Sequence, residues 1–587
     1  MEHLRKAVLA AAVAGALAPP WAAIAQALPE EVRSAGVTLA AWSGVQLAVK
    51  RSAAEKHVSE QALASVCARM GIELARGHRF DMNRMIALIS GRASELEALN
   101  AKLELETQQN DPAAGGLLKQ ARSAIDAGDL DGAEHFLREA GLAARSAVED
   151  AQRQEAEITA TDAQVKALQF DYLGAAATYA QAAGELPPGD SHDRWTYALR
   201  QADMLEQRGE LFEEPQALNN AVGVYRDTAL PLVDRSADPL DWAKTEIPLG
   251  WALEVTGERG DDAALHEAVA VERGALEAVT REQDPAVWAN AQNDLGVALE
   301  MLGYQGDDAA LRQAIVADRA ALTVRIRKSD PTHWADTENN LGNALFVLGE
   351  HGDDAALRQA IAAYRAELEV DTRPRSPNNW ATDQTNLGNA LEVLGRRSND
   401  TAALNDAAAA YRNALQVWTR DQDPFRWATA ENGLGTGLAD LGERGDAAAL
   451  HDAVATFRSA LEVRTRARDP ANWAMTQNNL GEALETLGER GDGAALRAAV
   501  AAERAALEVF TRDRDPAHWA MVQYNLGNAF EASALRGDAA ALGDAIAAYR
   551  EALEVWTPAA FPPKAKEASD GLARAQALMA KRGRPPP

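Results

Sequence analysis

The stretch "DPTHWADTENNLGNALFVLGEHGDDAALRQAIAAYRAELEV", residues 330–370, decides the fold because close copies of it follow one another along most of the chain. A tryptophan marks each copy. The spacing is 46 residues, except for 47 where "RRSNDTAAL" holds one extra residue. Regular self-similarity at roughly 20–50 residues indicates a repeat architecture. The seven tryptophans are Trp242, Trp288, Trp334, Trp380, Trp427, Trp473 and Trp519.

Each copy predicts two helices joined by a turn. The first helix opens with Asp-Pro in six copies and with Ser-Pro in the remaining one, so that Asp or Ser caps the helix and proline takes its first position. It ends at "GEHGD", where glycine can adopt a left-handed conformation, and Asp353 or Asp354 then caps the second helix. Apolar residues recur at helical spacing in both helices. In residues 330–370 these stripes are Trp334, Leu341, Ala344, Leu345 and Leu348, then Leu357, Ala360, Ile361, Tyr364 and Leu368.

"NNLGNAL" followed by "AIAAYRAEL" resembles the tetratricopeptide repeat, which has Leu-Gly on its first helix and Ala, an aromatic residue and Ala on its second. Glu367 departs from that motif, since the other copies mostly keep Ala there. The unit is longer than the usual length of about 34 residues. In this it resembles the extended repeats of kinesin light chains and bacterial scaffold proteins. The resemblance implies an all-α fold, a right-handed superhelix of antiparallel helix pairs.

Upstream and downstream of the clear repeats the pattern weakens, which gives the expected domain boundaries. Met82, Ile89, Leu96 and Leu103 recur every seven residues, which predicts a short coiled-coil-like helix. The expected segments are a signal peptide at 1–27, a helical region at 28–110, short repeat-like helices at 111–188, a degenerate repeat at 189–234, seven repeats at 235–557, and a capping helix with a tail at 558–587.

The first residues predict export. Arg5 and Lys6 precede the apolar run "AVLAAAVAGALA", and Ala25-Gln26-Ala27 follows with the small residues that signal peptidase requires. We therefore expect cleavage after Ala27 and a periplasmic or secreted protein. The run is shorter than the roughly 20 residues of a membrane-spanning helix, so no stable membrane insertion is predicted. Cys67 is the only cysteine, which excludes an internal disulfide.

The charge of the chain bears on its partners. Its 87 acidic and 59 basic residues give a formal net charge of −28 over 587 residues. Such a chain repels phosphate backbones, so nucleic-acid binding is not expected. The same charge keeps a long repeat protein soluble and favours neutral or basic partners.

Two residue types never vary among the copies and are predicted to be structural. Glycine inside a helix costs about 1 kcal/mol relative to alanine, so its recurrence predicts close contact between neighbouring helices. The tryptophans are predicted to be core residues, each worth about 3–5 kcal/mol if buried. The glycines are Gly250, Gly296, Gly342, Gly388, Gly435, Gly481 and Gly527.

Two polar columns on the first helix are the candidate site. Asn339 and Asn343 are four residues apart, and each lies about 200° around the helix from Leu341, so both point away from the packed side. The family resemblance implies that these columns line a concave groove, where amides could bind the backbone of an extended peptide. The alternative is an ordinary polar surface. The candidate residues are Asn293, Asn339, Asn343, Thr385, Asn389, Asn432, Asn478, Glu482, Tyr524 and Asn528.

Charge near these columns refines the expected partner. Only Lys244 is basic there, so an acidic peptide tail is not expected to bind, whereas a neutral or basic segment is favoured. Glutamates recur one helical turn further on, at Glu254, Glu300, Glu392, Glu485 and Glu531.

The sequence offers little for catalysis. The histidines are scattered, no Walker, HExxH or nucleophile-elbow motif occurs, and "GDD" lacks the alternating oxygen ligands of a calcium loop. No cofactor or metal site is predicted. We expect a non-enzymatic scaffold that binds protein or peptide. The alternatives are a periplasmic cell-envelope assembly factor that oligomerises through residues 28–110, a regulatory subunit of an enzyme, and a cytosolic signalling scaffold.

Overall fold

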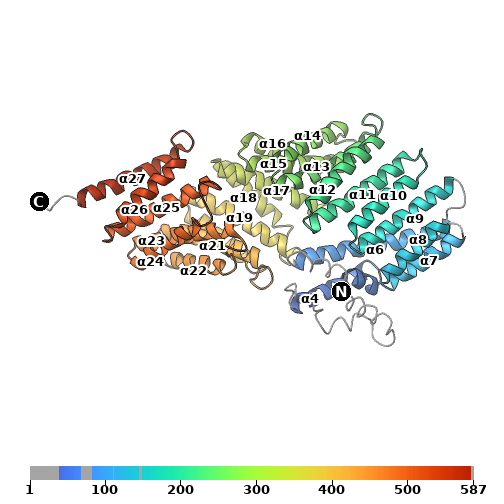
Figure 1. Cartoon of the computed structure of the whole chain (residues 1–587), viewed down its shortest axis with the longest axis horizontal. Helices are drawn as coiled ribbons and strands as arrows, with labels where there is room; N and C mark the ends of the chain where they lie inside the picture. Colours follow the sequence, from blue (N-terminus) through green and yellow to red (C-terminus); the bar gives the residue numbers. More distant parts are fainter. Residues whose placement is uncertain (1–38, 68–81, 110–111, 144–148, 583–587) are drawn as a thin grey trace. The chain divides into compact units, whose positions relative to one another are not determined.

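The computed structural model describes residues 39–67, 82–109, 112–143 and 149–582. Every regular element in these ranges is a helix, and no strand occurs in them (Figure 1). No described helix combines the length and the apolar character needed to cross a bilayer. The chain divides into two compact units, residues 1–330 and 331–587. The predicted signal peptide, residues 1–27, lies outside the described residues.

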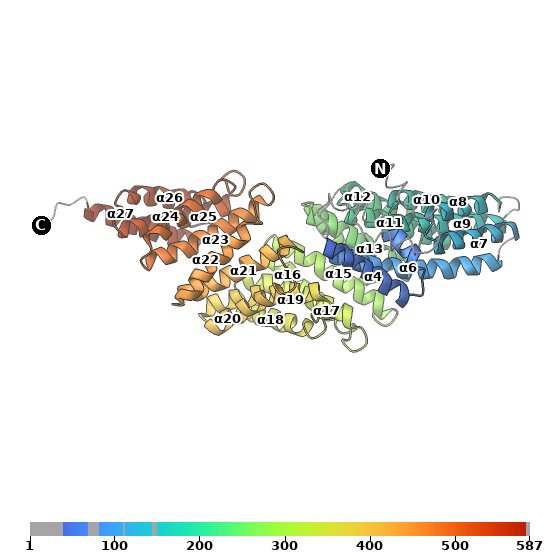
Figure 2. The ribbon, with the colours of Figure 1, turned by 90° about the horizontal axis from the view of Figure 1, so that it is seen from below.

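Pairs of helices follow one another through both units, and consecutive helices within a unit pack side by side (Figures 1 and 2). This confirms the all-helical repeat architecture. The first helices of the predicted pairs, here called A helices, are α13 (Pro239–Glu258), α15 (Pro285–Tyr304), α17 (Pro331–Glu350), α19 (Pro377–Ser398), α21 (Pro424–Glu443), α23 (Pro470–Glu489) and α25 (Pro516–Leu535). The second, or B, helices are α14 (Asp262–Ala278), α16 (Asp308–Ala321), α18 (Asp354–Glu367), α20 (Thr401–Ala414), α22 (Ala447–Leu461), α24 (Gly493–Ala506) and α26 (Ala541–Val555).

Turn chemistry sets where these helices begin and end. Every A helix starts at its proline. Before α18, Gly352 has φ +116°, and the Asp353 carboxylate accepts hydrogen bonds from the backbone N–H groups of Ala355 and Ala356, both at 3.0 Å. The extra residue of "RRSNDTAAL" brings Asn399 into the left-handed region instead, with φ +54°. In the A helices the predicted cap is present at Asp284, Asp423 and Asp515. It is absent at Asp238, Ser376 and Asp469, which form no side-chain cap bond.

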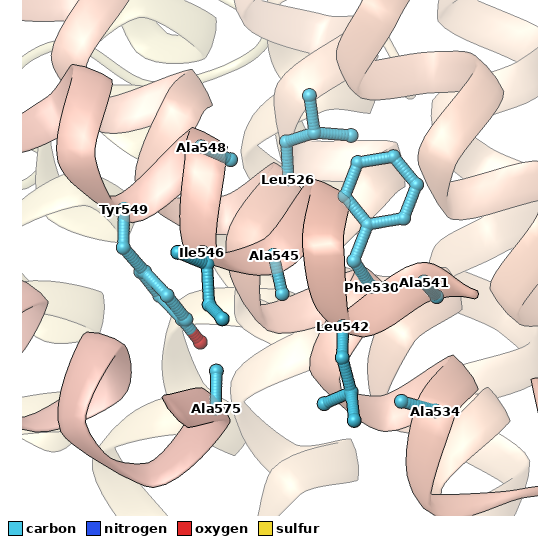
Figure 3. Close-up of a cluster of buried hydrophobic side chains, with 10 residues drawn as sticks. All are labelled: Leu526, Phe530, Ala534, Ala541, Leu542, Ala545, Ile546, Ala548, Tyr549 and Ala575. Carbon is cyan, nitrogen blue, oxygen red and sulfur yellow. The ribbon is translucent and has the colours of Figure 1, made fainter. Parts of the chain in front are cut away.

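The core is a series of apolar clusters between helices. In the last pair, Leu526 and Phe530 of α25 meet Leu542 and Tyr549 of α26 (Figure 3). Helix α27 (Pro562–Arg582) closes the far side of Tyr549 and contributes Ala575 to the cluster. It packs on α26 as an A helix packs on the preceding B helix.

The tryptophans border these clusters and are not enclosed by them. All seven are half-buried, so the prediction of full core residues is corrected for Trp242, Trp288, Trp334, Trp380, Trp427, Trp473 and Trp519. Trp380 and Trp427, for example, pack against the cluster that contains the buried Trp418. The aliphatic B-helix residues and alanines fill the centre, which leaves each indole at the edge between two pairs.

Unit 1 begins with helices outside the clear repeats. They are α4 (Leu39–Glu55), α6 (Met82–Gln109), α7 (Pro112–Asp126), α8 (Leu130–Ala143), α9 (Glu149–Leu168), α10 (Tyr172–Glu185), α11 (Ser191–Leu211) and α12 (Pro215–Val224), followed by short turns of π-helix (Tyr225–Ala229) and 3-10 helix (Leu230–Leu232). Ile89, Leu96 and Leu103 of α6 are buried against α4, α7 and α9 of the same chain. A coiled coil through this stripe is therefore not supported, because its seam is already covered.

Candidate functional site

Each invariant glycine lies against one B-helix side chain of its own pair. A Cβ added at Gly342 would lie 2.6 Å from Tyr364 Cε1, and one at Gly481 would lie 2.1 Å from Glu503 Oε1. The glycine thus makes room for a large side chain across the pair. The contacts are Gly250 with Glu272, Gly296 with Asp318, Gly342 with Tyr364, Gly388 with Tyr411, Gly435 with Phe457, Gly481 with Glu503 and Gly527 with Tyr549.

Where that B-helix residue is tyrosine, its hydroxyl reaches the predicted amide columns. Tyr364 Oη donates to Asn343 Oδ1 at 2.8 Å, Asn343 Nδ2 donates to Asn339 Oδ1 at 3.1 Å, and Asn339 Nδ2 donates to Glu367 Oε2 at 3.0 Å. These side chains are partly buried, and their amides join an A helix to its own B helix. Tyr411 bonds Asn389 and Tyr549 bonds Asn528 in the same way, both at 2.7 Å.

The remaining candidate residues also have partners inside the chain. Asn293 Oδ1 accepts from Arg325 at 2.8 Å, Asn432 Oδ1 accepts from Asn479 at 3.3 Å, and Asn478 Oδ1 accepts from Asn525 at 3.0 Å. Thr385 and Asn478 are 8% and 2% exposed. They are closed to solvent, so they do not point outward as the helical geometry predicted. The Tyr524 ring packs at a tilt against the rings of Tyr549 and Trp556, with interplanar angles of 54° and 49°.

Two pairs carry glutamate in place of tyrosine. Both carboxylate oxygens of Glu272 and of Glu503 are buried without a hydrogen-bond partner among the described residues. Each lies beside two further carboxylates. We call Glu254, Glu272 and Asp294 the first acid cluster, and Glu482, Glu485 and Glu503 the second.

In the first acid cluster, burial and the neighbouring carboxylates raise the pKa of Glu272 and of Glu254 well above the ordinary value. Desolvation raises the pKa of Asp294 to about 6, although the Asn293 hydrogen bond and the Arg325 guanidinium oppose the shift. Glu254 also has one buried oxygen, Oε1, without a partner in the described structure. The cluster therefore concentrates acid groups without a matching cation beside Glu272.

The second acid cluster reaches solvent through Glu482. The side chain is exposed but closely surrounded by protein, and this desolvation raises its pKa to about 7. Asn525 Nδ2 donates to Glu482 Oε1 at 2.9 Å. Burial, followed by the repulsion of Glu482 and Glu485, raises the pKa of Glu503 well above the ordinary value. Elsewhere in the glutamate column, by contrast, Glu392 pairs with Arg396 at 2.8 Å and Glu531 with Arg574 at 3.1 Å.

Sequence reasoning missed a third group of acids. Glu367, Asp371 and Asp383 come together where α18 meets α19, with one carboxylate oxygen of each within 4.8 Å of the others. The departure at Glu367 from the alanine column was the available signal. Its convergence with the other two depends on how the pairs stack, which a single repeat does not show.

Comparison with protein-family models finds no match, and no curated protein matches the chain. Solved structures are similar in fold. BtubC (BKLC) from P. vanneervenii is 21% identical, with 43% of this chain and 93% of that chain covered and a TM-score of 0.30. The Cut9 chain of the APC/C hetero-tetramer Cut9–Hcn1 is 15% identical over 79% and 96%, with a TM-score of 0.32. The TPR domain of P58(IPK) is 16% identical over 73% and 100%, with a TM-score of 0.21. We take no function from likenesses this low.

Proposed function

We propose that this chain is a non-enzymatic scaffold that binds an extended polypeptide with basic side chains along its A helices. The two acid clusters carry the proposal, because each sets carboxylates around a buried glutamate without a hydrogen-bond partner. A lysine or arginine side chain supplies the charge and the N–H donors that such a site lacks. The raised pKa values mean that Glu272 and Glu503 hold protons in the free chain, and a bound cation would favour their ionised form.

The amide columns have a structural part in this proposal. Asn343, Asn389 and Asn528 accept hydrogen bonds from tyrosines, which fixes the A helices relative to their B helices. A rigid face loses little freedom on binding and so retains more of the interaction energy. Recognition of the peptide backbone by these amides stays a prediction.

Peptide binding to the full chain tests the proposal. Fluorescence anisotropy would compare three labelled peptides of equal length: a lysine- and arginine-rich one, a neutral one and an acidic one. We expect the basic peptide to bind most tightly, with an affinity that falls as salt rises. Tighter binding of the acidic peptide, or equal binding of all three, would overturn the proposal.

A pair of variants separates the cluster from general surface charge. Glu482→Gln removes the exposed carboxylate of the second acid cluster and should weaken the basic peptide several-fold. Asp513→Asn removes an equal charge at an exposed position outside the clusters and should leave its affinity nearly unchanged. Equal effects of the two variants would show that net charge alone attracts the peptide.

The compartment is a separate proposal. We propose export to the periplasm or beyond, supported by the sequence of residues 1–27. N-terminal sequencing of the protein purified from its native cells tests this, and an intact Met1 on cytoplasmic protein would overturn it.

A further inference from the structure

The junctions between a B helix and the A helix that follows it provide a comparison within one chain. Three equivalent positions meet at such a junction: two at the end of the B helix or just after it, and one on the next A helix. After α14 these positions hold Ala275, Val279 and Ala291, which form an apolar cluster. After α20 they hold Ala414, Trp418 and Ala430, also in an apolar cluster. Stacking therefore needs no charge at these positions.

The junction after α18 is different at all three positions. Glu367, Asp371 and Asp383, here called the acid junction, replace the apolar residues and are 3%, 7% and 1% exposed. One carboxylate oxygen of each lies within 4.8 Å of the other two. In the described part of the chain no ion pair joins any of them to a lysine or arginine.

The carboxylates of the acid junction have few hydrogen-bond donors around them. Asn339 Nδ2 donates to Glu367 Oε2 at 3.0 Å and fixes that side chain. Asp383 Oδ2 is buried, and the only side chain of the described residues that hydrogen-bonds Asp383 is the Glu367 carboxyl, which can do so only while one of the two acids is protonated. Three carboxylates gathered in a nearly dry place repel one another unless a positive charge or protons neutralise them. Three buried carboxylates that each bring an oxygen to one point, without a lysine or arginine beside them, form the kind of oxygen cluster that binds a cation.

We propose that Glu367, Asp371 and Asp383 bind one divalent cation, with Ca²⁺ preferred over Mg²⁺. Carboxylate oxygens are the ligands of both ions, and oxygens about 2.3–2.6 Å from Ca²⁺ can lie up to roughly 5 Å apart. Mg²⁺ is smaller and requires a nearly regular octahedron, whereas Ca²⁺ accepts one or both oxygens of each carboxylate in irregular geometry. The bound ion ties the end of α18 to α19, and through Glu367 it extends the Asn339–Asn343–Tyr364 chain of hydrogen bonds.

The competing state is one in which protons take the place of the ion. Burial and the mutual repulsion of the carboxylates raise the pKa of Glu367 and of Asp383. Protonated acids need no metal, so the two states differ in their response to calcium at neutral pH.

The test uses the full chain after removal of metals with a chelator. Titration calorimetry with CaCl₂ and, separately, MgCl₂ at pH 7.5 should show one Ca²⁺ per chain and weaker Mg²⁺ binding. Calcium at about 100 times its Kd should raise the melting temperature by several degrees. Absence of both heat and thermal shift would overturn the proposal in favour of protonated acids, and equal affinities would overturn the preference for Ca²⁺.

A variant that borrows the residues of another junction keeps the fold intact. The triple change Glu367→Ala, Asp371→Val and Asp383→Ala installs the apolar set found after α14, so the protein should fold and lose the Ca²⁺ response. Asp421→Asn, at an exposed position, is the matched control and should retain it. A triple variant that still binds one Ca²⁺ with unchanged affinity would place the ion elsewhere and overturn the assignment.

Discussion

Gly342 sets the spacing between α17 and α18. Its missing side chain admits the ring of Tyr364, whose Cε1 would be 2.6 Å from an added Cβ. We expect Gly342→Ala to destabilise the protein by about 1–3 kcal/mol, because overpacking outweighs the gain of about 1 kcal/mol in helix propensity. Urea denaturation followed by circular dichroism measures the difference.

Gly437 is the matched control for this substitution. It lies within α21, and the nearest atom to an added Cβ is Ala408 N at 4.0 Å. Gly437→Ala should therefore leave stability unchanged or raise it by up to about 1 kcal/mol. If both variants destabilise the chain equally, close packing on Tyr364 is not the reason for the glycine.

At this scale the sequence predicted the glycine contact but not the direction of the amides. The seven-fold recurrence of glycine indicated a steric cause, and the structure supplies it. The outward direction of Asn343 followed from helical geometry alone. That geometry ignores the length of Tyr364, whose hydroxyl spans the pair and bonds Asn343 from the neighbouring helix.

The start of each B helix depends on one capping aspartate. Asp446 accepts hydrogen bonds from the backbone N–H groups of Ala448 and Ala449, both at 3.0 Å. Asp446→Ala should cost about 1 kcal/mol, since two amide groups at the helix start lose their acceptor. Asp452→Ala, an exposed change later in α22, is the control. Chemical denaturation measures the stability of both variants. A larger loss for Asp446→Ala than for Asp452→Ala would indicate capping, whereas equal losses would indicate an effect of charge alone.

The limits of the helices could be predicted because their signals are local. Proline, aspartate and glycine act on the backbone within a few residues, so α17 ends at Glu350 and α18 begins after Asp353, as the sequence indicated. The heptad of α6 shows the opposite case. A stripe such as Ile89, Leu96 and Leu103 predicts that something covers it, but the pattern is the same whether the cover is another chain or α4, α7 and α9.

For the whole molecule, buried carboxyls predict a stability that falls as pH rises. Burial raises the pKa of Glu300 from the ordinary 4.5 to about 8. Between these values the unfolded chain has released the proton that the folded chain keeps, so rising pH favours unfolding by up to about 1.4 kcal/mol per pH unit for one such group. Glu246, with a pKa of about 7, acts in the same direction.

We therefore expect the urea midpoint to fall between pH 5 and pH 8. Glu300→Gln keeps the shape of the side chain but does not titrate, so its midpoint should fall less steeply over this range. Glu282→Gln, at an exposed position, should follow the wild-type slope. Parallel curves for all three proteins would mean that Glu300 is not protonated in the folded chain.

The similarity of the junctions has a consequence for how the gene can change. After α14 and after α20, one A helix meets the preceding B helix through small and apolar residues that another pair could also offer. Unequal crossing-over between two copies of the coding repeat would then add or delete a whole helix pair. The helices that become neighbours would still meet through compatible apolar surfaces. A crossover that parted α18 from α19 would instead leave Glu367 and Asp371 facing a partner without Asp383. Recombination should therefore conserve that adjacency while it shuffles the apolar ones.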